Sequence, residues 1–224
     1  MTAYVVTNEA EACLPLHRHE DARIIVVLEG EVHESDLSGK RVFRKGEILF
    51  RPPFCAHANA PSGARSSFLR LSVSRKYWLD YVRRHGWRGM RGRLDFKSRD
   101  QRALLHAKSG GDGVLSLLVE DDGSPDGNWE EAGVARHSSL HALAASNGLE
   151  PYQLTRRFQQ RYGLTPSAWR REWRLRRALA LLAEGCVLAD IAVECGFSDQ
   201  SHLSREVKRA TGMAPAAFQR FACD

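Results

Sequence analysis

A chain of 224 residues with 43% hydrophobic residues, 27% charged residues and a net charge of +6 is long enough for one large or two small domains. This length excludes a peptide hormone, and the lack of a long uncharged apolar run excludes a transmembrane protein. Residues 1–11 have neither the basic nor the apolar stretch of a signal peptide, so we expect a cytoplasmic protein.

The positive charge is distributed unevenly along the chain. The net charge is −1 for residues 1–69, +9 for 70–108, −4 for 109–125 and +2 for 126–224. Glycine and aspartate cluster in the acidic segment, which is typical of a break between domains. We therefore predict an α+β protein with two domains, at 1–73 and 126–224, joined by a basic helical connector at 74–125.

The first domain has the pattern of short β-strands. Apolar and β-branched segments are separated by glycine and proline turns, and they occupy residues 22–28, 41–43, 47–51 and 67–73. Closely spaced short strands with turn signals between them indicate a small antiparallel barrel or sandwich.

Residues 13–73 resemble the two motifs of a cupin. His17, Arg18 and His19 precede a strand that Gly30 closes, and Gly46-Glu47 and Pro52 are followed by His57. The resemblance implies a small β-barrel in which His17, His19 and His57 converge on a transition metal. Where the cupin glutamate ligand should fall, the sequence has Arg23 and Ile24. Glu20 lies near that position, and Asn59 lies near the position of the asparagine expected after the last histidine, but both are out of register. We predict no firm cofactor, and our first interpretation is a sensing barrel without an ion, with a metal site as the alternative.

The connector combines aromatic and basic residues at helical spacing. Tyr77, Trp78, Tyr81 and Val82 recur at steps of one, three and four residues, which predicts an amphipathic helix. Its basic residues suit either a solvated face, a contact with the DNA backbone or a surface that pairs subunits.

The last hundred residues contain an internal repeat. With an offset of 49, Leu154 matches Leu203, Arg156 matches Arg205, and further matches pair Gly163 with Gly212, Pro166 with Pro215 and Trp169 with Phe218. Upstream the offset is 48, which places a one-residue length difference in a turn. The repeat predicts two copies of one helical unit, near 140–162 and 188–210.

Each copy is predicted to form a helix-turn-helix. Short helices at 140–146 and 188–195 end before Gly148 and Gly196, and second helices begin at Pro151 and after Ser198, the expected N-cap. We expect the core faces of these second helices to be Leu154, Phe158 and Tyr162, and Leu203, Val207 and Ala210. Between the copies, a helix of about 18 residues runs from Pro166 to a stop at Gly185.

The run from Leu140 to Phe221 resembles the AraC/XylS transcription regulators. The residues that carry the resemblance are Arg174 to Ala178, Leu181-Leu182, Asp190 to Ala192, Gly196 to Leu203, Arg205, Gly212 and Pro215. The amphipathic pattern of the second helices and the family resemblance together predict the DNA-reading residues Tyr152, Gln153, Arg156, Arg157, Gln200, Ser201, His202 and Arg205. The family's opening helix has only weak candidates here, at 114–120 and 129–136.

Together these patterns predict a one-component regulator that binds specific double-stranded DNA and is not an enzyme. The resemblance adds as candidate partners a small-molecule or metal effector, a second copy of the chain and, for an activator, RNA polymerase; no membrane partner is expected. Two alternatives stay open at this point. One is a metal-dependent cupin enzyme or sensor fused to a DNA-binding module, and the other is an architectural nucleic-acid binder without sequence preference.

Overall fold

The structure, a computed structural model, describes residues 3–10, 12–85, 90–93 and 139–223. Its contacts divide the chain into two units, one made mainly of strands (Met1–Glu34 and Arg41–Ser124) and one made mainly of helices (Ser35–Lys40 and Pro125–Asp224). Each unit is described by itself. Within the described residues, no helix is both long and apolar enough to cross a bilayer.

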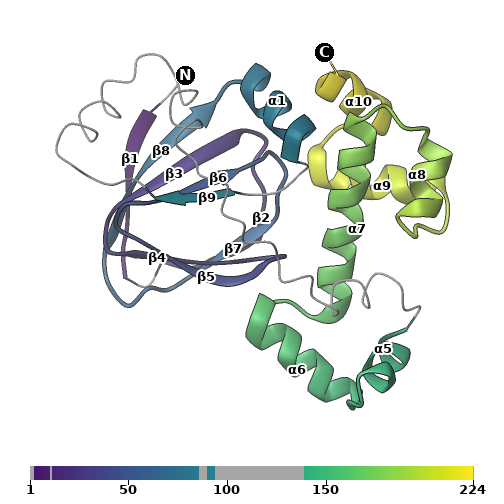
Figure 1. Cartoon of the computed structure of the whole chain (residues 1–224), viewed down its shortest axis with the longest axis horizontal. Coiled ribbons are helices and arrows are strands. Elements are labelled where there is room, and N and C mark those ends of the chain that lie inside the picture. Colours follow the sequence, from purple (N-terminus) through teal and green to yellow (C-terminus); the bar gives the residue numbers. More distant parts are fainter. Residues whose placement is uncertain (1–2, 11, 86–89, 94–138, 224) are drawn as a thin grey trace. The chain divides into compact units, whose positions relative to one another are not determined.

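The N-terminal unit contains two antiparallel sheets (Figure 1). The strands of the five-stranded sheet lie in the order β1 (Ala3–Asn8), β8 (Ser66–Val73), β3 (Ala22–Glu29), β6 (Glu47–Arg51) and β9 (Met90–Arg93). Those of the four-stranded sheet lie in the order β2 (Leu14–His17), β7 (His57–Ala60), β4 (Glu31–Asp36) and β5 (Gly39–Arg44). The described strands form two separate sheets, so of the barrel and the sandwich that the sequence predicted the structure has the sandwich, and the small barrel of the cupin resemblance is not seen as a closed sheet.

An apolar cluster fills the space between the two sheets. Val27 and Leu49 of the first sheet pack with Val32 and Phe43 of the second, and all four are at most 8% exposed. Strand β3 consists largely of isoleucine and valine, whose branched side chains suit a pleated, buried surface. The turn after β3 requires Gly30, because its φ is +70° and a Cβ there would lie 2.6 Å from the carbonyl oxygen of Arg65.

The predicted connector contains a helix and a strand in its described part. Helix α1 (Arg75–His85) buries Trp78 and Leu79 and exposes Tyr77, as expected for an amphipathic helix. Strand β9 was not expected, and it pairs with β6 in the first sheet. The rest of the connector and the candidate opening helices at 114–120 and 129–136 lie outside the described residues, so the domain limits stay a prediction.

The C-terminal unit consists of six described helices whose bounds follow the predicted repeat. They are α5 (Leu140–Ser146), α6 (Pro151–Tyr162), α7 (Pro166–Ala183), α8 (Leu188–Glu194), α9 (Gln200–Thr211) and α10 (Pro215–Cys223). The turn between α5 and α6 has four residues and that between α8 and α9 has five, which confirms the predicted one-residue difference. Helix α7 has the expected 18 residues.

The two helix-turn-helix units end their first helices in the same way. Gly148 and Gly196 have φ angles of +63° and +71°. The amide of Leu149 donates to the carbonyl of Ala144 at 2.9 Å, and the amide of Phe197 donates to that of Ala192 at 2.8 Å. This is the Schellman arrangement, in which a left-handed residue lets the chain turn while the last carbonyls of the helix keep donors.

The hydrophobic cores of the units also match. Leu154, Phe158, Tyr162 and Trp169 are each at most 1% exposed and belong to one cluster around α5, α6 and the start of α7. In the second unit, Leu203, Val207 and Phe218 are fully buried at the matching positions.

Two details of the second unit differ from expectation. The N-cap of α9 is Asp199 and not Ser198, because the Asp199 carboxylate accepts the amide of His202 at 2.7 Å. Ala210 is only half-buried, and the buried residue of the last turn is Thr211, whose hydroxyl donates to the carbonyl of Val207 at 2.8 Å.

Candidate functional site

The predicted DNA-reading side chains of the first helix-turn-helix lie on α6, opposite its buried face. Tyr152 is 69% exposed, and Arg156 and Arg157 are also exposed. Leu154 and Phe158, between and beside them in sequence, are 1% exposed. The helix therefore fixes itself through its apolar face and presents an aromatic ring and two guanidinium groups to a partner.

The side chain of Gln153 is engaged in a hydrogen bond that caps the start of α6. Its Oε1 accepts the backbone amide of Glu150 at 2.9 Å, while the Glu150 side chain accepts the amide of Gln153, and the two bonds form a capping box. Bidentate reading of an adenine requires both the oxygen and the nitrogen of a glutamine amide. In this conformation only the Gln153 nitrogen is left to donate, so Gln153 is less suited to read a base than its position in the helix suggests.

The predicted DNA-reading side chains of the second helix-turn-helix lie at the start of α9. Gln200, Ser201 and Arg205 are exposed, and His202 is half-exposed. The Nδ1 of His202 lies 3.2 Å from the hydroxyl of Ser198, and its ring meets that of Phe197 edge-on with centroids 5.3 Å apart. This arrangement orients the His202 ring and leaves its Nε2 for a partner.

The two units differ in charge around their reading faces. Helix α6 and the first half of α7 carry a single acid, the buried Glu172. They carry six arginines, which are Arg156, Arg157, Arg161, Arg170, Arg171 and Arg174. On α9, the carboxylate of Glu206 forms an ion pair with Arg209, and the exposed carboxylate of Asp199 caps the helix. A hydrogen bond from the amide of His202 holds the pKa of Asp199 below its usual value. Arginines that can contact DNA phosphates are therefore more readily available from the first helix-turn-helix and the start of α7 than from the second helix-turn-helix.

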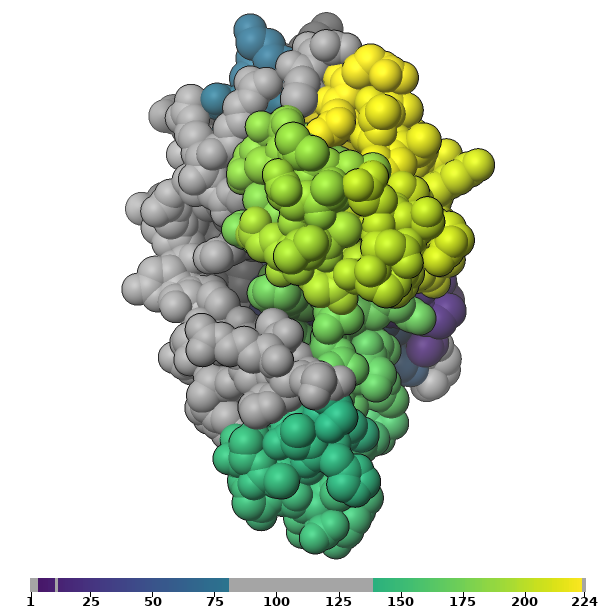
Figure 2. Space-filling model, turned by 90° about the vertical axis from the view of Figure 1, so that its right-hand side faces the viewer, coloured from purple at the N-terminus to yellow at the C-terminus, as the bar shows by residue number. Residues whose placement is uncertain are grey.

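Helix α7 joins the two units and sets their spacing. Figure 2 shows α5 and α6 (teal) at one end of α7 and α8 to α10 (yellow-green to yellow) at the other. Its 18 residues span about 27 Å at about 1.5 Å per residue. Major grooves recur on one face of DNA about every 34 Å. Two recognition helices held by such a helix can enter successive major grooves.

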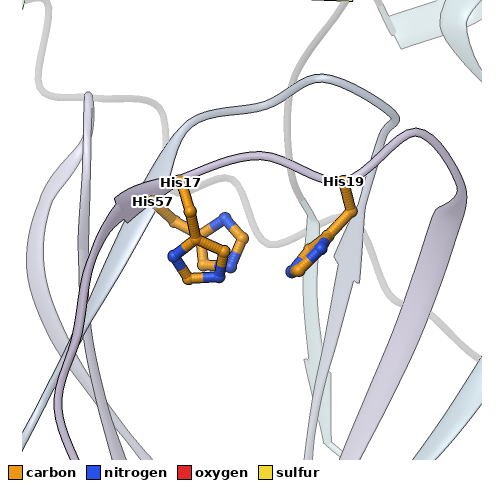
Figure 3. Close-up of side chains that lie close together, drawn as sticks. All are labelled: His17, His19 and His57. Atoms are coloured by element: carbon orange, nitrogen blue, oxygen red, sulfur yellow. The ribbon is translucent and has the colours of Figure 1, made fainter.

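The three predicted metal-binding histidines of the N-terminal unit lie together (Figure 3). His17 ends β2 and is paired with His57 at the start of β7, and His19 approaches from the segment that leads to β3. Their ring centroids are 4.2 to 5.1 Å apart, and one ring nitrogen from each lies within 4.8 Å of the others. The strand pairing therefore unites residues that are forty positions apart.

The protonation state of the cluster suits a metal ligand set. Burial lowers the pKa of His19 to about 4, with further lowering by the charge of Arg23. Burial and the charge of Arg51 also hold the pKa of His57 well below its usual value. The Nδ1 atoms of His17 and His57 lie 2.7 and 3.2 Å from the carbonyls of Pro15 and Cys55, so each ring can donate there and keep its Nε2 lone pair. Neutral imidazoles held in this way are the ligands that transition metals such as zinc accept.

Charged residues that were not singled out in the sequence lie beside the cluster. Arg51 and Glu34 form a buried ion pair and are 6% and 3% exposed. Asp21 binds Arg23 at 2.6 Å and Arg70 at 3.3 Å. The sequence signal for Glu34 was its spacing from Val32. Residues two apart in a strand lie on the same face, so the carboxylate of Glu34 shares the buried face of Val32.

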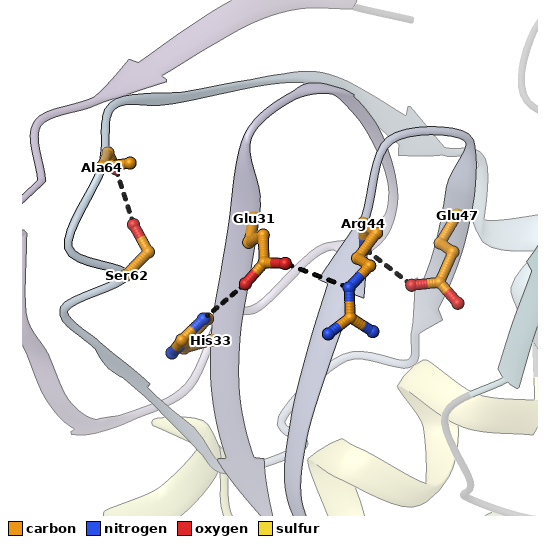
Figure 4. Close-up of polar contacts among 6 residues, drawn as sticks. All are labelled: Glu31, His33, Arg44, Glu47, Ser62 and Ala64. Atoms are coloured by element: carbon orange, nitrogen blue, oxygen red, sulfur yellow. Dashed lines mark hydrogen bonds and ion pairs between the residues drawn. The ribbon is translucent and has the colours of Figure 1, made fainter.

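A second polar network links β4 and β5 of the four-stranded sheet to the start of β6 in the five-stranded sheet (Figure 4). The carboxylate of Glu31 bridges His33 at 3.1 Å and Arg44 at 3.0 Å, and the amide of Arg44 donates to Glu47 at 2.6 Å. Arg44 is 68% exposed and Glu31 is 41% exposed. We interpret this network as a solvent-exposed link between the β4, β5 and β6 turns and not as a binding site. Exposed ion pairs of this kind contribute little to the free energy of unfolding.

Comparisons with known proteins concern the helical unit. Residues 143–220 match the model of a family described as "Helix-turn-helix domain". The bifunctional transcriptional activator/DNA repair enzyme Ada of Escherichia coli K12 is 35% identical over 81 residues, which are 36% of this chain and 23% of Ada. The arabinose operon regulatory protein of the same strain is 32% identical over 95 residues, which are 42% of this chain and 30% of that protein.

One solved structure, an AraC-type transcriptional regulator from Chromobacterium violaceum, is 29% identical over 42% of this chain and 86% of that one. Its TM-score of 0.38 carries no conclusion about the fold. The chain spans less than a third of the length of the two curated relatives, so their activities as whole proteins are not transferred to it. The family model, the two curated relatives and the duplicated helix-turn-helix identify residues 143–220 as a DNA-binding domain of AraC/XylS type.

Proposed function

We propose that this protein is a cytoplasmic, sequence-specific transcription regulator in which the helical unit reads DNA and the β-sandwich controls that reading. The observation that carries the proposal is the repeat of one exposed recognition helix at each end of α7. An isolated amphipathic helix has many uses, whereas two in matching register, joined by a helix of about 27 Å, favour DNA binding.

The first turns of α6 and α9 would lie in adjacent major grooves. Arg156 and Arg205, at matching positions of the repeat, would make bidentate contacts with guanine or contacts with phosphate. Tyr152 would pack its ring against base edges, and the arginines of α7 would bind the backbone. The remaining proposed contacts come from Gln153, Arg157, Gln200, Ser201 and His202.

The test is selection of binding sites from random DNA, followed by footprinting with excess nonspecific competitor at physiological salt. A regulator should protect two sites about one helical turn apart. The variants Tyr152→Ala and Arg156→Ala should weaken the footprint, whereas Arg65→Ala, an exposed arginine of the other unit, should not. Protection that disappears with competitor would support the architectural alternative.

For the β-sandwich we propose an effector role through a transition-metal site at His17, His19 and His57. The residues fit such an ion, because three imidazoles converge and carbonyls orient two of them. The ion would supply a fixed positive charge and open coordination positions. No catalysis is proposed, since three histidines without a carboxylate or a described substrate cavity do not by themselves define an enzyme.

Metal analysis of purified protein and titration with Co²⁺ test this site. One equivalent should bind, and His57→Ala should abolish binding. His33→Ala is the matched control, because His33 is a half-exposed histidine of the same unit that contacts Glu31 instead. Equal binding by the two variants would refute the assignment. Turnover of a substrate that is lost together with the ion would instead support the enzyme alternative.

Control by the β-sandwich would act through subunit pairing or, for an activator, through RNA polymerase. Sedimentation of the protein with and without Co²⁺, and transcription from a selected site with purified polymerase, distinguish these routes. Control by the sandwich would be refuted if both the oligomeric state and promoter output stayed the same with and without the ion.

A further inference from the structure

The surroundings of the histidine cluster carry more positive than negative charge. Arg23 of β3 and Arg51 of β6 are direct neighbours across the first sheet, and Arg70 of β8 lies beside Ile25 one pleat further along β3. The charges of all three arginines act on His19. The acids of this network are Asp21 and Glu34, and each already binds arginine.

A divalent ion on three imidazoles would therefore lack charge compensation, because an imidazole ligand carries no negative charge. Among the residues that the structure describes, the cluster contains no carboxylate, and Arg23 stands at one of the positions where a glutamate ligand was expected. Two positive charges would be added next to three arginines that only two carboxylates balance. In a partly buried site, where charges are screened less than in water, such an excess weakens binding of the ion, and an accompanying anion would offset it.

One arginine also has an unused donor. The Nε of Arg70 is buried and has no hydrogen-bond partner in the described part of the chain. The guanidinium lies over the ring of Tyr4, 5.2 Å from its centroid, and binds Asp21 only through Nη2. A buried N–H without an acceptor is unfavourable, and an anionic ligand would supply the acceptor.

We propose that the effector of the β-sandwich is a small organic carboxylate that binds together with the ion. The carboxylate would bind the ion and accept hydrogen bonds from the arginine side of the site, where Arg70 has an unused donor. Guanidinium groups match carboxylates in shape and charge. This inference rests on the metal site proposed above and assigns the chemical class of its effector.

The experiment is a titration of the full chain with Co²⁺, followed by visible absorption and calorimetry, in the presence and absence of propionate. We expect propionate to tighten Co²⁺ binding by about tenfold and to change the absorption band of the bound ion. Since coupling is reciprocal, Co²⁺ should tighten propionate binding by the same factor. Phosphate and chloride are run in parallel, because a response to every anion would indicate general charge screening and overturn the assignment to carboxylates.

Variants separate this inference from the metal site itself. Arg70→Gln should bind Co²⁺ but lose most of the effect of propionate, whereas the exposed Arg65→Gln should retain it. If Co²⁺ binds and propionate changes neither affinity nor spectrum, the carboxylate is refuted and the metal site stands. If Co²⁺ does not bind with or without propionate, both fail.

Discussion

Replacing Gln153 by alanine should destabilise α6 more than it weakens DNA binding. The substitution removes the hydrogen bond that the amide of Glu150 donates to Oε1 at 2.9 Å, while the reciprocal bond to the Glu150 side chain remains. One such bond contributes about 0.5–1.5 kcal/mol to the free energy of unfolding. For a helical domain of about 100 residues, this corresponds to a fall in Tm of about 4–8 °C per kcal/mol.

The effect on DNA binding should be small for the same reason. A glutamine that read adenine through both amide atoms would contribute about 1–3 kcal/mol, or about 5- to 150-fold in Kd. With its oxygen engaged in the cap, Gln153 should contribute less than about threefold, because only its nitrogen remains to contact a base. Thermal unfolding gives the first quantity, and fluorescence anisotropy on a selected DNA site gives the second.

Two further variants make the comparison specific. Gln153→Glu keeps an acceptor for the cap and should retain the wild-type Tm, whereas Tyr152→Ala should retain the Tm and weaken binding, since Tyr152 is 69% exposed. The capping argument is refuted if Gln153→Ala keeps the wild-type Tm and loses tenfold or more in affinity.

Three other predictions follow from the same structure. Arg156→Ala should weaken operator binding more than Arg205→Ala in an anisotropy assay, because Arg156 is one of six arginines on α6 and the first half of α7, whereas Glu206 is next to Arg205 on α9; equal losses would contradict this order. Gly196→Ala should lower the free energy of unfolding in denaturant titrations by about 1–2 kcal/mol, since φ is +71° and a Cβ would lie 3.2 Å from an arginine of α7; wild-type stability would exclude this strain. Burial raises the pKa of Cys195 to about 11, so at pH 8 about one thiol in a thousand is ionised, and iodoacetamide should modify the exposed Cys13 far faster; equal labelling by mass spectrometry would count against it.

The recognition of the helical unit depended on local signals. Apolar residues at three- and four-residue steps, Pro151 and Pro166 at helix starts, and Gly148 and Gly196 after helix ends predicted the bounds of the helices closely. Backbone hydrogen bonds in a helix join residues four apart, so the information that begins and ends a helix lies within one turn of sequence. The repeat added a second, independent copy of that information.

The β-sandwich was less accessible to the same reasoning. The sequence predicted four of the nine described strands and the three histidines, and it left a barrel and a sandwich as alternatives. The strands that it did not predict are β1, β2, β4, β7 and β9. Strand pairing joins distant residues, and its partners depend on the whole sheet.

The sequence by itself determined a duplicated helix-turn-helix of AraC/XylS type and the residue types that face outward from it. Only the tertiary structure decided which of those side chains are already engaged, as Gln153 is, and which distant groups meet, as His17 meets His57 and Arg51 meets Glu34. The physical reason is that periodicity fixes the direction of a side chain, whereas its partners, its charge environment and its pKa depend on neighbours that the folded chain brings from elsewhere.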